Sequence, residues 1–187
     1  MESQSAKYVP RPTQPTGHER HFAEDEIIVS KTDPSGRITY ANDVFLRVAG
    51  YTASQILGQP HSIIRHPDMP RAVFSLLWDT ISAGSEIFAY VVNLSKNGDH
   101  YWVFAHVTPT FDDGGKIVGY HSSRRVPNPA AIRAIQPVYA EMLAVERQQP
   151  DKRSAVAAGR ELLAAKLVSL GLTYDALMFH LEIGSEA

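Results

Sequence analysis

The chain has 187 residues, of which 44% are apolar and 20% are charged, with a formal net charge of −2 and a pI of about 6.4. This balance excludes a protein that attracts nucleic acid or anionic membrane by bulk charge. The absence of cysteine excludes disulfides, thiolate zinc sites, iron–sulfur clusters, haem attached through C-x-x-C-H, and any cofactor bonded to a thiol. The length allows one domain with a proper core and an appendage.

The first 20 residues are polar and contain several prolines, which predicts a flexible N-terminal arm over 1–20. They contain no apolar stretch typical of a signal peptide. No apolar run in the chain approaches the roughly 20 residues needed to span a bilayer. We therefore expect a cytoplasmic protein.

The ordered part of the chain is predicted to begin with a β-hairpin. "EIIVSKTD" (26–33) and "RITYAN" (37–42) are short β-branched runs on either side of an Asp-Pro-Ser-Gly turn signal. From Asn42 the apolar residues recur at helical spacing until Gly50, and a second short helix is predicted over 52–58.

The segment "SIIRHPDMPRAVF" (62–74) is unsuited to the interior of a strand or helix, because two prolines, an imidazole and two charges fall within six residues. An amphipathic helix follows, with an apolar stripe over 73–81 and an end near Gly84. Phe74 and Trp78 lie one helical turn apart on the adjoining face. The segment before the helix is therefore a candidate binding loop.

Three strands are predicted next, over 86–95, 100–111 and 117–126. The first two are joined by Asn97-Gly98, the strongest short hairpin signal. Alternation along the first of these strands places Tyr90 and Asn93 on opposite faces.

These elements predict an α+β fold with a five-stranded antiparallel sheet and short helices on one face. A ligand cavity is expected between the sheet and the helices. The predicted organisation is the arm over 1–20, a domain over 21–127 and a helical extension over 128–187. The apolar stripes of the extension either pack back on the sheet or pair two copies of the chain, and we expect a homodimer.

Several phrases carry a resemblance to a known family: "ITYAND", "GQPH", "RHPDMP" and "KNGDHYWV", in this order. Over roughly residues 20–127 the chain resembles the PAS sensor domain of bacterial aerotaxis receptors. The resemblance implies the PAS fold and flavin adenine dinucleotide (FAD) held non-covalently. It also implies a flavin whose redox state reports respiratory electron flow or oxygen.

The resemblance implies a cofactor-binding set made of Asn42, Arg65, His66, Asp68, Phe74, Trp78 and Asn93. The guanidinium of Arg65 suits a pyrophosphate. The carboxamide of Asn93 can both donate and accept, which suits an isoalloxazine edge. Phe74 and Trp78 could wall the ring system.

Each of these residues also has an ordinary structural interpretation. Asn42 is placed to cap a helix, Arg65 and Asp68 could form a local ion pair, and His66 suits a hydrogen-bonded turn. The two helix aromatics could be core residues. The histidines show no metal-ligand spacing, so no metal site is predicted.

Flavin-type relatives usually carry Trp-x-Gly in the first long strand, whereas this chain has Ile87-Phe88-Ala89. A gas sensor binding haem b through a helix-borne histidine is therefore an alternative, and so is a cofactor-free interaction module. The chain lacks G-x-S-x-G, P-loop and G-x-G-x-x-G motifs, so we expect no enzyme. The extension carries no output motif, which implies a separate signalling partner of the chemoreceptor, kinase or cyclase type.

Overall fold

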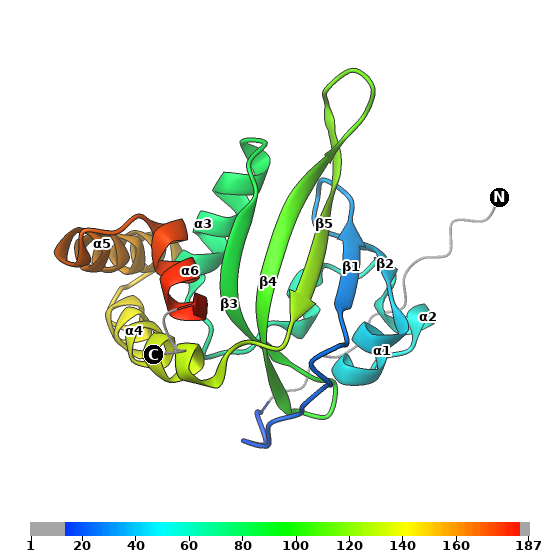
Figure 1. Cartoon of the computed structure of the whole chain (residues 1–187), viewed down its shortest axis with the longest axis horizontal. Helices are drawn as coiled ribbons and strands as arrows, with labels where there is room; N and C mark the ends of the chain where they lie inside the picture. Colours follow the sequence, from blue (N-terminus) through cyan, green and yellow to red (C-terminus); the bar gives the residue numbers. More distant parts are fainter. Residues whose placement is uncertain (1–13, 184–187) are drawn as a thin grey trace.

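The computed structural model describes residues 14–183. Its five strands form one antiparallel sheet in the order β2-β1-β5-β4-β3 (Figure 1). The strands are β1 (Ile28–Thr32), β2 (Ile38–Ala41), β3 (Ile87–Leu94), β4 (His100–Phe111) and β5 (Ile117–Arg125). The predicted α+β class with a five-stranded antiparallel sheet is confirmed.

Helices surround the sheet at both ends of its strand order. Figure 1 shows α1 and α2 beside β1 and β2, while α3, α4, α5 and α6 gather beside β3. The helices are α1 (Asp43–Ala49), α2 (Ala53–Ile56), a 3-10 turn η1 (His61–Ile64), α3 (Arg71–Ser82), α4 (Pro129–Arg147), α5 (Lys152–Leu170) and α6 (Tyr174–Ile183). We call the sheet face toward α3 the inner face and the opposite one the outer face.

Local sequence explains where the helices begin. The side chain of Asn42 accepts a hydrogen bond of 3.0 Å from the backbone N–H of Phe45 and so caps α1. Asp151 caps α5 in the same way, accepting from the N–H groups of Arg153 (2.8 Å) and Ser154 (2.9 Å). The helix α3 begins directly after Pro70, which has no N–H to leave unsatisfied.

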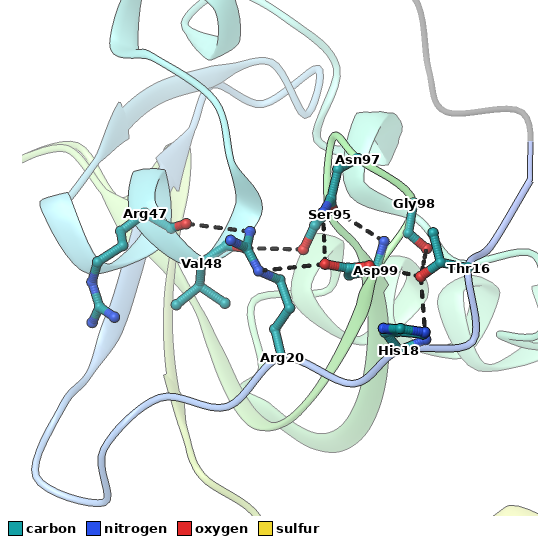
Figure 2. A network of polar contacts seen from close by, with 9 residues as sticks. All are labelled: Thr16, His18, Arg20, Arg47, Val48, Ser95, Asn97, Gly98 and Asp99. Carbon is teal, nitrogen blue, oxygen red and sulfur yellow. Dashed lines mark hydrogen bonds and ion pairs between the residues drawn. The ribbon is translucent and has the colours of Figure 1, made fainter.

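Part of the predicted N-terminal arm lies against the β3–β4 turn (Figure 2). The backbone N–H of Thr16 donates to the carbonyl of Gly98 at 2.8 Å, and the Thr16 hydroxyl donates to the carboxylate of Asp99 at 2.7 Å. The guanidinium of Arg20 donates to the carbonyl of Val48 at 2.7 Å, at the end of α1. Residues 14–20 are thus held by the domain, and residues 1–13 of the predicted arm lie outside the described residues.

The C-terminal helices cover the outer face of β3 and β4. The Tyr139 ring on α4 lies 6.4 Å from that of Trp102, and the Phe179 ring on α6 lies 4.8 Å from that of Phe88, both measured between centroids. The Tyr139 hydroxyl donates to the carbonyl of Tyr90 at 2.8 Å. Of the two predicted uses of the apolar stripes, packing on the sheet is therefore observed, while the homodimer stays a prediction.

A buried carboxylate joins α4 to the start of α3. Glu146 is 6% exposed, and its two oxygens accept hydrogen bonds of 3.0 and 2.9 Å from the backbone N–H groups of Arg71 and Ala72. Helix α5 packs closely on this junction at Gly159, where a Cβ atom would lie 2.7 Å from Oε1 of Glu146 and 2.8 Å from the Cβ of Ala72. The N-terminus of α3 is therefore capped by a residue 74 or 75 positions later in the chain.

Among residues 14–183, no single helix is long and apolar enough to cross a membrane. Helices α5 and α6 meet that length and composition together, but the pair is bent by 65° at the break between them.

Candidate functional site

A cavity of about 540 Å³ lies between α3 and the inner face of the sheet. Its volume is within the range of roughly 300–1,000 Å³ found for small-molecule sites. Most of its wall is apolar and includes Leu77, Ile81, Val91, Ala105 and Val107. The predicted position of a ligand site between sheet and helices thus coincides with a real cavity.

Aromatic side chains form one side of the cavity. Phe74 and Trp78 project from α3 into its lining, and the guanidinium of Arg65 stacks over the Phe74 ring at 4.0 Å from the centroid. The Trp78 ring meets Tyr120 edge-on at 5.4 Å. Trp78 also approaches the β1–β2 turn closely, because a Cβ atom at Gly36, whose φ is +80°, would lie 2.8 Å from the indole.

The opposite end of the cavity is polar. Arg124 on β5 is 3% exposed, and its Nη2 donates to Oγ of Ser30 at 2.6 Å and to Nε2 of His61 at 2.8 Å. Because arginine can only donate, Nε2 of His61 is the acceptor in this pair. Within residues 14–183, the buried Nη1 of Arg124 and Oγ of Ser122 have no hydrogen-bond partner.

This polar end holds a buried positive charge beside a neutral imidazole. Burial, and then the charge of Arg124, lower the pKa of His61 to about 3. Burial also lowers the pKa of Arg124, to about 10, which leaves the guanidinium protonated at neutral pH. No acidic side chain forms an ion pair with Arg124 among the described residues. A buried cation with an unpartnered N–H is arranged to receive a polar, electron-rich group.

Four of the seven predicted site residues meet at the cavity: Arg65, Phe74, Trp78 and Asn93. Asn93 is 3% exposed and lies on the inner face of β3, as the alternation predicts. Its backbone forms an isolated bridge with Arg65, which ties the "RHPDMP" segment to the edge of the sheet. No hydrogen bond joins the Asn93 carboxamide to another side chain in the described part of the chain.

The other three, Asn42, His66 and Asp68, do not line this cavity. The carboxamide of Asn42 is used in the hairpin and the cap, since Nδ2 donates to the carbonyl of Ile27 at 2.8 Å and Oδ1 accepts from the N–H of Val29 at 3.0 Å. The Nδ1 of His66 accepts from the backbone N–H of Asp68 at 3.1 Å, and the pKa of this buried imidazole is lowered mainly by desolvation. Their predicted contact with a cofactor stays a prediction.

The polar end of the cavity consists of Ser30, His61, Ser122 and Arg124, none of which was predicted as a site residue from the sequence. Part of this polar end could have been predicted from the sequence of β5. Tyr120, Ser122 and Arg124 alternate along β5 with side chains on the inner face, and an arginine at such a position in a central strand has to be buried. His61 offered no comparable signal, because it begins the short 3-10 turn η1, which follows no strand or helix periodicity.

Comparison with known proteins gives a family match and related sequences. Residues 38–124 match the model of a family described as the PAS fold. The aerotaxis receptor of Escherichia coli (strain K12) is 45% identical over 118 residues, which are 63% of this chain and 23% of the receptor. A nitrogen fixation regulatory protein of Klebsiella pneumoniae is 28% identical over 99 residues, or 53% of this chain and 20% of that protein. This chain therefore spans less than a quarter of the length of either relative.

Solved structures share the architecture. The structure titled "Flavin Analogue Sheds Light on Light-Oxygen-Voltage Domain Mechanism" has a TM-score of 0.51 and 22% sequence identity to this chain. The alignment covers 62% of this chain and 86% of that one. At this identity the likeness concerns the fold.

Proposed function

Because residues 38–124 form a PAS domain similar to that of an aerotaxis receptor, we propose that the chain is a cytoplasmic redox or oxygen sensor. In this proposal the inner-face cavity binds FAD non-covalently, and the redox state of the flavin changes the contacts of the surrounding helices. The chain acts by conformational change and not by turnover. It signals to a separate protein of the chemoreceptor, kinase or cyclase type, and it works as a homodimer.

The observation that carries the proposal is the contrast between the walls of the cavity and its polar end. A flavin ring system is flat, has apolar faces and exposes donors and acceptors along one edge. The aromatic and aliphatic walls suit the faces, while Nη1 of Arg124 and Oγ of Ser122 have no hydrogen-bond partner in residues 14–183 and Asn93 adds a carboxamide to the lining. The residues present therefore fit the group.

A bound flavin would supply reversible electron transfer coupled to proton uptake. Electron and proton uptake would change the charge and the hydrogen-bonding groups along the edge of the ring. Residues of the chain that line the cavity would respond to that change. Asn93 can turn its amide to donate or to accept, whereas Arg124 remains cationic and favours a gain of negative charge beside it. The neutral His61 holds the guanidinium in place by accepting from Nη2.

Strand β3 offers a route from the cavity to the extension. Asn93 lies on its inner face, and Tyr90, three residues earlier, lies on its outer face. The carbonyl of Tyr90 accepts from the hydroxyl of Tyr139 at 2.8 Å, and the hydroxyl of Tyr90 donates to Glu182 at 2.6 Å. A change in hydrogen bonding at Asn93 on one face of β3 therefore has a short route to α4 and α6, which bind Tyr90 on the other face.

The test is the visible absorption spectrum of the purified protein, before and after reduction. We expect the two bands of an oxidised flavin, which bleach on reduction with dithionite and return in air. Arg124→Gln should lower flavin occupancy at least about tenfold, because it removes a charge-assisted hydrogen bond at the polar end. The matched control is Arg125→Gln, one residue further on β5, whose side chain is exposed and should leave occupancy unchanged.

A colourless protein that takes up no added FAD would overturn the proposal. The same spectrum separates the haem b alternative, which predicts an intense Soret band in place of the flavin bands. His66 does not line the inner-face cavity, and Nε2 of His61, which does, already accepts from Arg124. Steady oxidation of a reduced nicotinamide by the flavin-loaded protein would contradict a sensor without turnover.

A further inference from the structure

A second cavity, of about 690 Å³, lies where the helical extension meets the domain. One side is the segment from Arg65 to Met69, and the other side is formed by the end of α4 and the beginning of α5. The apolar side chains of Met69, Leu94, Leu143 and Ala155 contribute to its wall. Helices α4 and α5 lie beyond residues 38–124, so no part of the matched family region could supply this wall.

The two cavities meet. Four residues, Ser62, Arg65, Arg71 and Lys152, line both of them. Three of these four are cationic, and they come from the loop after η1, the start of α3 and the start of α5. Within residues 14–183, neither Arg71 nor Lys152 forms an ion pair with an acidic side chain. The passage between the cavities is therefore positively charged.

The acidic groups nearby do not pair with Arg71 or Lys152, because each accepts hydrogen bonds or forms an ion pair elsewhere. Glu146 accepts from two N–H groups at the start of α3, and Asp151 accepts from two at the start of α5. Asp68 is paired with Arg147, with 3.2 Å between Oδ1 and Nη2. Arg71 and Lys152 are thus available to bind an anionic ligand, and Arg65 lines both cavities beside them.

We propose that the two cavities form one binding site for a flavin dinucleotide, and that the helical extension completes it. The isoalloxazine occupies the inner-face cavity, the pyrophosphate lies at the passage between Arg65, Arg71 and Lys152, and the adenosine half occupies the second cavity. This inference rests on the proposed binding of FAD and adds to it a subsite for the adenosine half and a binding residue on α5. Charge-assisted hydrogen bonds from the three cations suit a group with two ionised phosphates.

A dinucleotide in this position would touch the domain and the extension at once. Lys152 and Val156 reach the inner-face cavity from α5, while Leu143 and Ala155 wall the second one. The ligand is therefore expected to fasten the extension to the domain, and its adenosine half should contribute affinity that a mononucleotide lacks. The site should discriminate between FAD and FMN, which share the isoalloxazine and one phosphate.

The experiment is a titration of the full-length apoprotein with FAD, FMN and riboflavin, followed by flavin fluorescence and calorimetry. We expect FAD to bind at least about tenfold more tightly than FMN. Lys152→Glu should weaken FAD binding by about tenfold or more, because it reverses a charge at the pyrophosphate. Arg153→Glu is the matched control: its side chain is exposed, it lines neither cavity, and its effect should be below about twofold.

A second variant tests the adenosine half separately. Ala155→Leu adds bulk to the wall of the second cavity and should reduce FAD affinity toward that of FMN while leaving FMN binding unchanged. Equal affinity for FAD and FMN, or equal effects of Lys152→Glu and Arg153→Glu, would overturn this inference and leave the flavin function intact. Failure of all three flavins to bind would instead overturn the proposed function itself.

Discussion

Side chains alternate between the two faces of β3 and β4, but one face is covered by helices and the other borders a cavity. The outer face presents large aromatic side chains, namely Phe88, Tyr90, Trp102 and Phe104, and α4 and α6 pack directly on them. Where the cavity of about 540 Å³ lies, the inner face presents smaller or polar side chains, namely Val91, Asn93, Ala105 and Val107. The large ring of Tyr101, opposite Asn93 on the same face, is fully buried and does not line the cavity. The cavity therefore coincides with the part of the inner face where the side chains are small, although one backbone carries both faces.

The largest expected effect comes from making a hole where the extension packs. Met142 on α4 is fully buried in the core that includes Trp102 and Tyr139. Met142→Ala should lower the free energy of unfolding by about 2–5 kcal/mol, measured by urea denaturation. Leu170→Ala, at a residue that is 58% exposed, is the control and should change it by less than about 0.5 kcal/mol. Equal effects would mean that the extension is not packed as described.

A smaller loss is expected at the junction between the extension and the cavity helix. Glu146→Ala leaves two N–H groups at the start of α3 without their acceptor. The free energy of unfolding should fall by about 1–3 kcal/mol. Glu146→Gln keeps one acceptor oxygen and should recover part of the loss. If both variants matched the parent protein in thermal melting, the cap would contribute nothing to stability.

Acid should lower the free energy of unfolding of the apoprotein, because His61 at the inner-face cavity resists protonation in the folded state. The pKa of His61 is lowered to about 3 in the folded state from an ordinary value of 6.5, so between these values the unfolded chain binds the proton and the folded chain does not. Stability therefore falls as the pH falls below 6.5, at up to about 1.4 kcal/mol per pH unit from this residue.

His61→Gln should reduce the slope of stability against pH between pH 6.5 and 5, measured by urea denaturation at several pH values. It should not abolish the slope, because burial lowers the pKa of His66 and His121 as well. An unchanged slope in the variant would show that His61 titrates normally in the folded protein.

The smallest effect on stability is expected from filling the inner-face cavity. Ala105 lies on β4 and lines the cavity. Ala105→Val adds two methyl groups toward open space and should change the free energy of unfolding of the apoprotein by less than about 1 kcal/mol. It should nevertheless lower flavin occupancy, read from the visible spectrum. A destabilisation comparable to that of Met142→Ala would contradict the contrast between the two faces.

Local patterns in the sequence were enough to predict the sheet. The Asn97-Gly98 turn and the alternation that separates Tyr90 from Asn93 depend on neighbouring residues alone, and both are observed. The helix that carries Phe74 and Trp78 follows from its apolar periodicity. The resemblance to a PAS domain supplied the association of Arg65 and Asn93 with these aromatics, and all four residues line the inner-face cavity. Their contact with a cofactor stays a prediction.

The remaining features depend on contacts between distant parts of the chain. No pattern around His61 shows that it will meet Arg124, 63 residues later. The cap on α3 comes from Glu146, which reads in the sequence as an ordinary charged residue near the end of a helix. The second cavity likewise exists because α4 and α5 fold back onto the segment after η1, and helical periodicity does not specify where a helix docks.

Gly159 lies where α5 packs on the junction between α3 and α4. Its missing side chain lets α5 approach Glu146 and Ala72 more closely than an alanine would allow. A methyl group there would clash with Glu146 and Ala72 and push α5 away from them, which would also displace Lys152 and Val156 at the edge of the inner-face cavity. The absence of a side chain at Gly159 therefore sets how closely α5 approaches the sheet-bearing part of the protein.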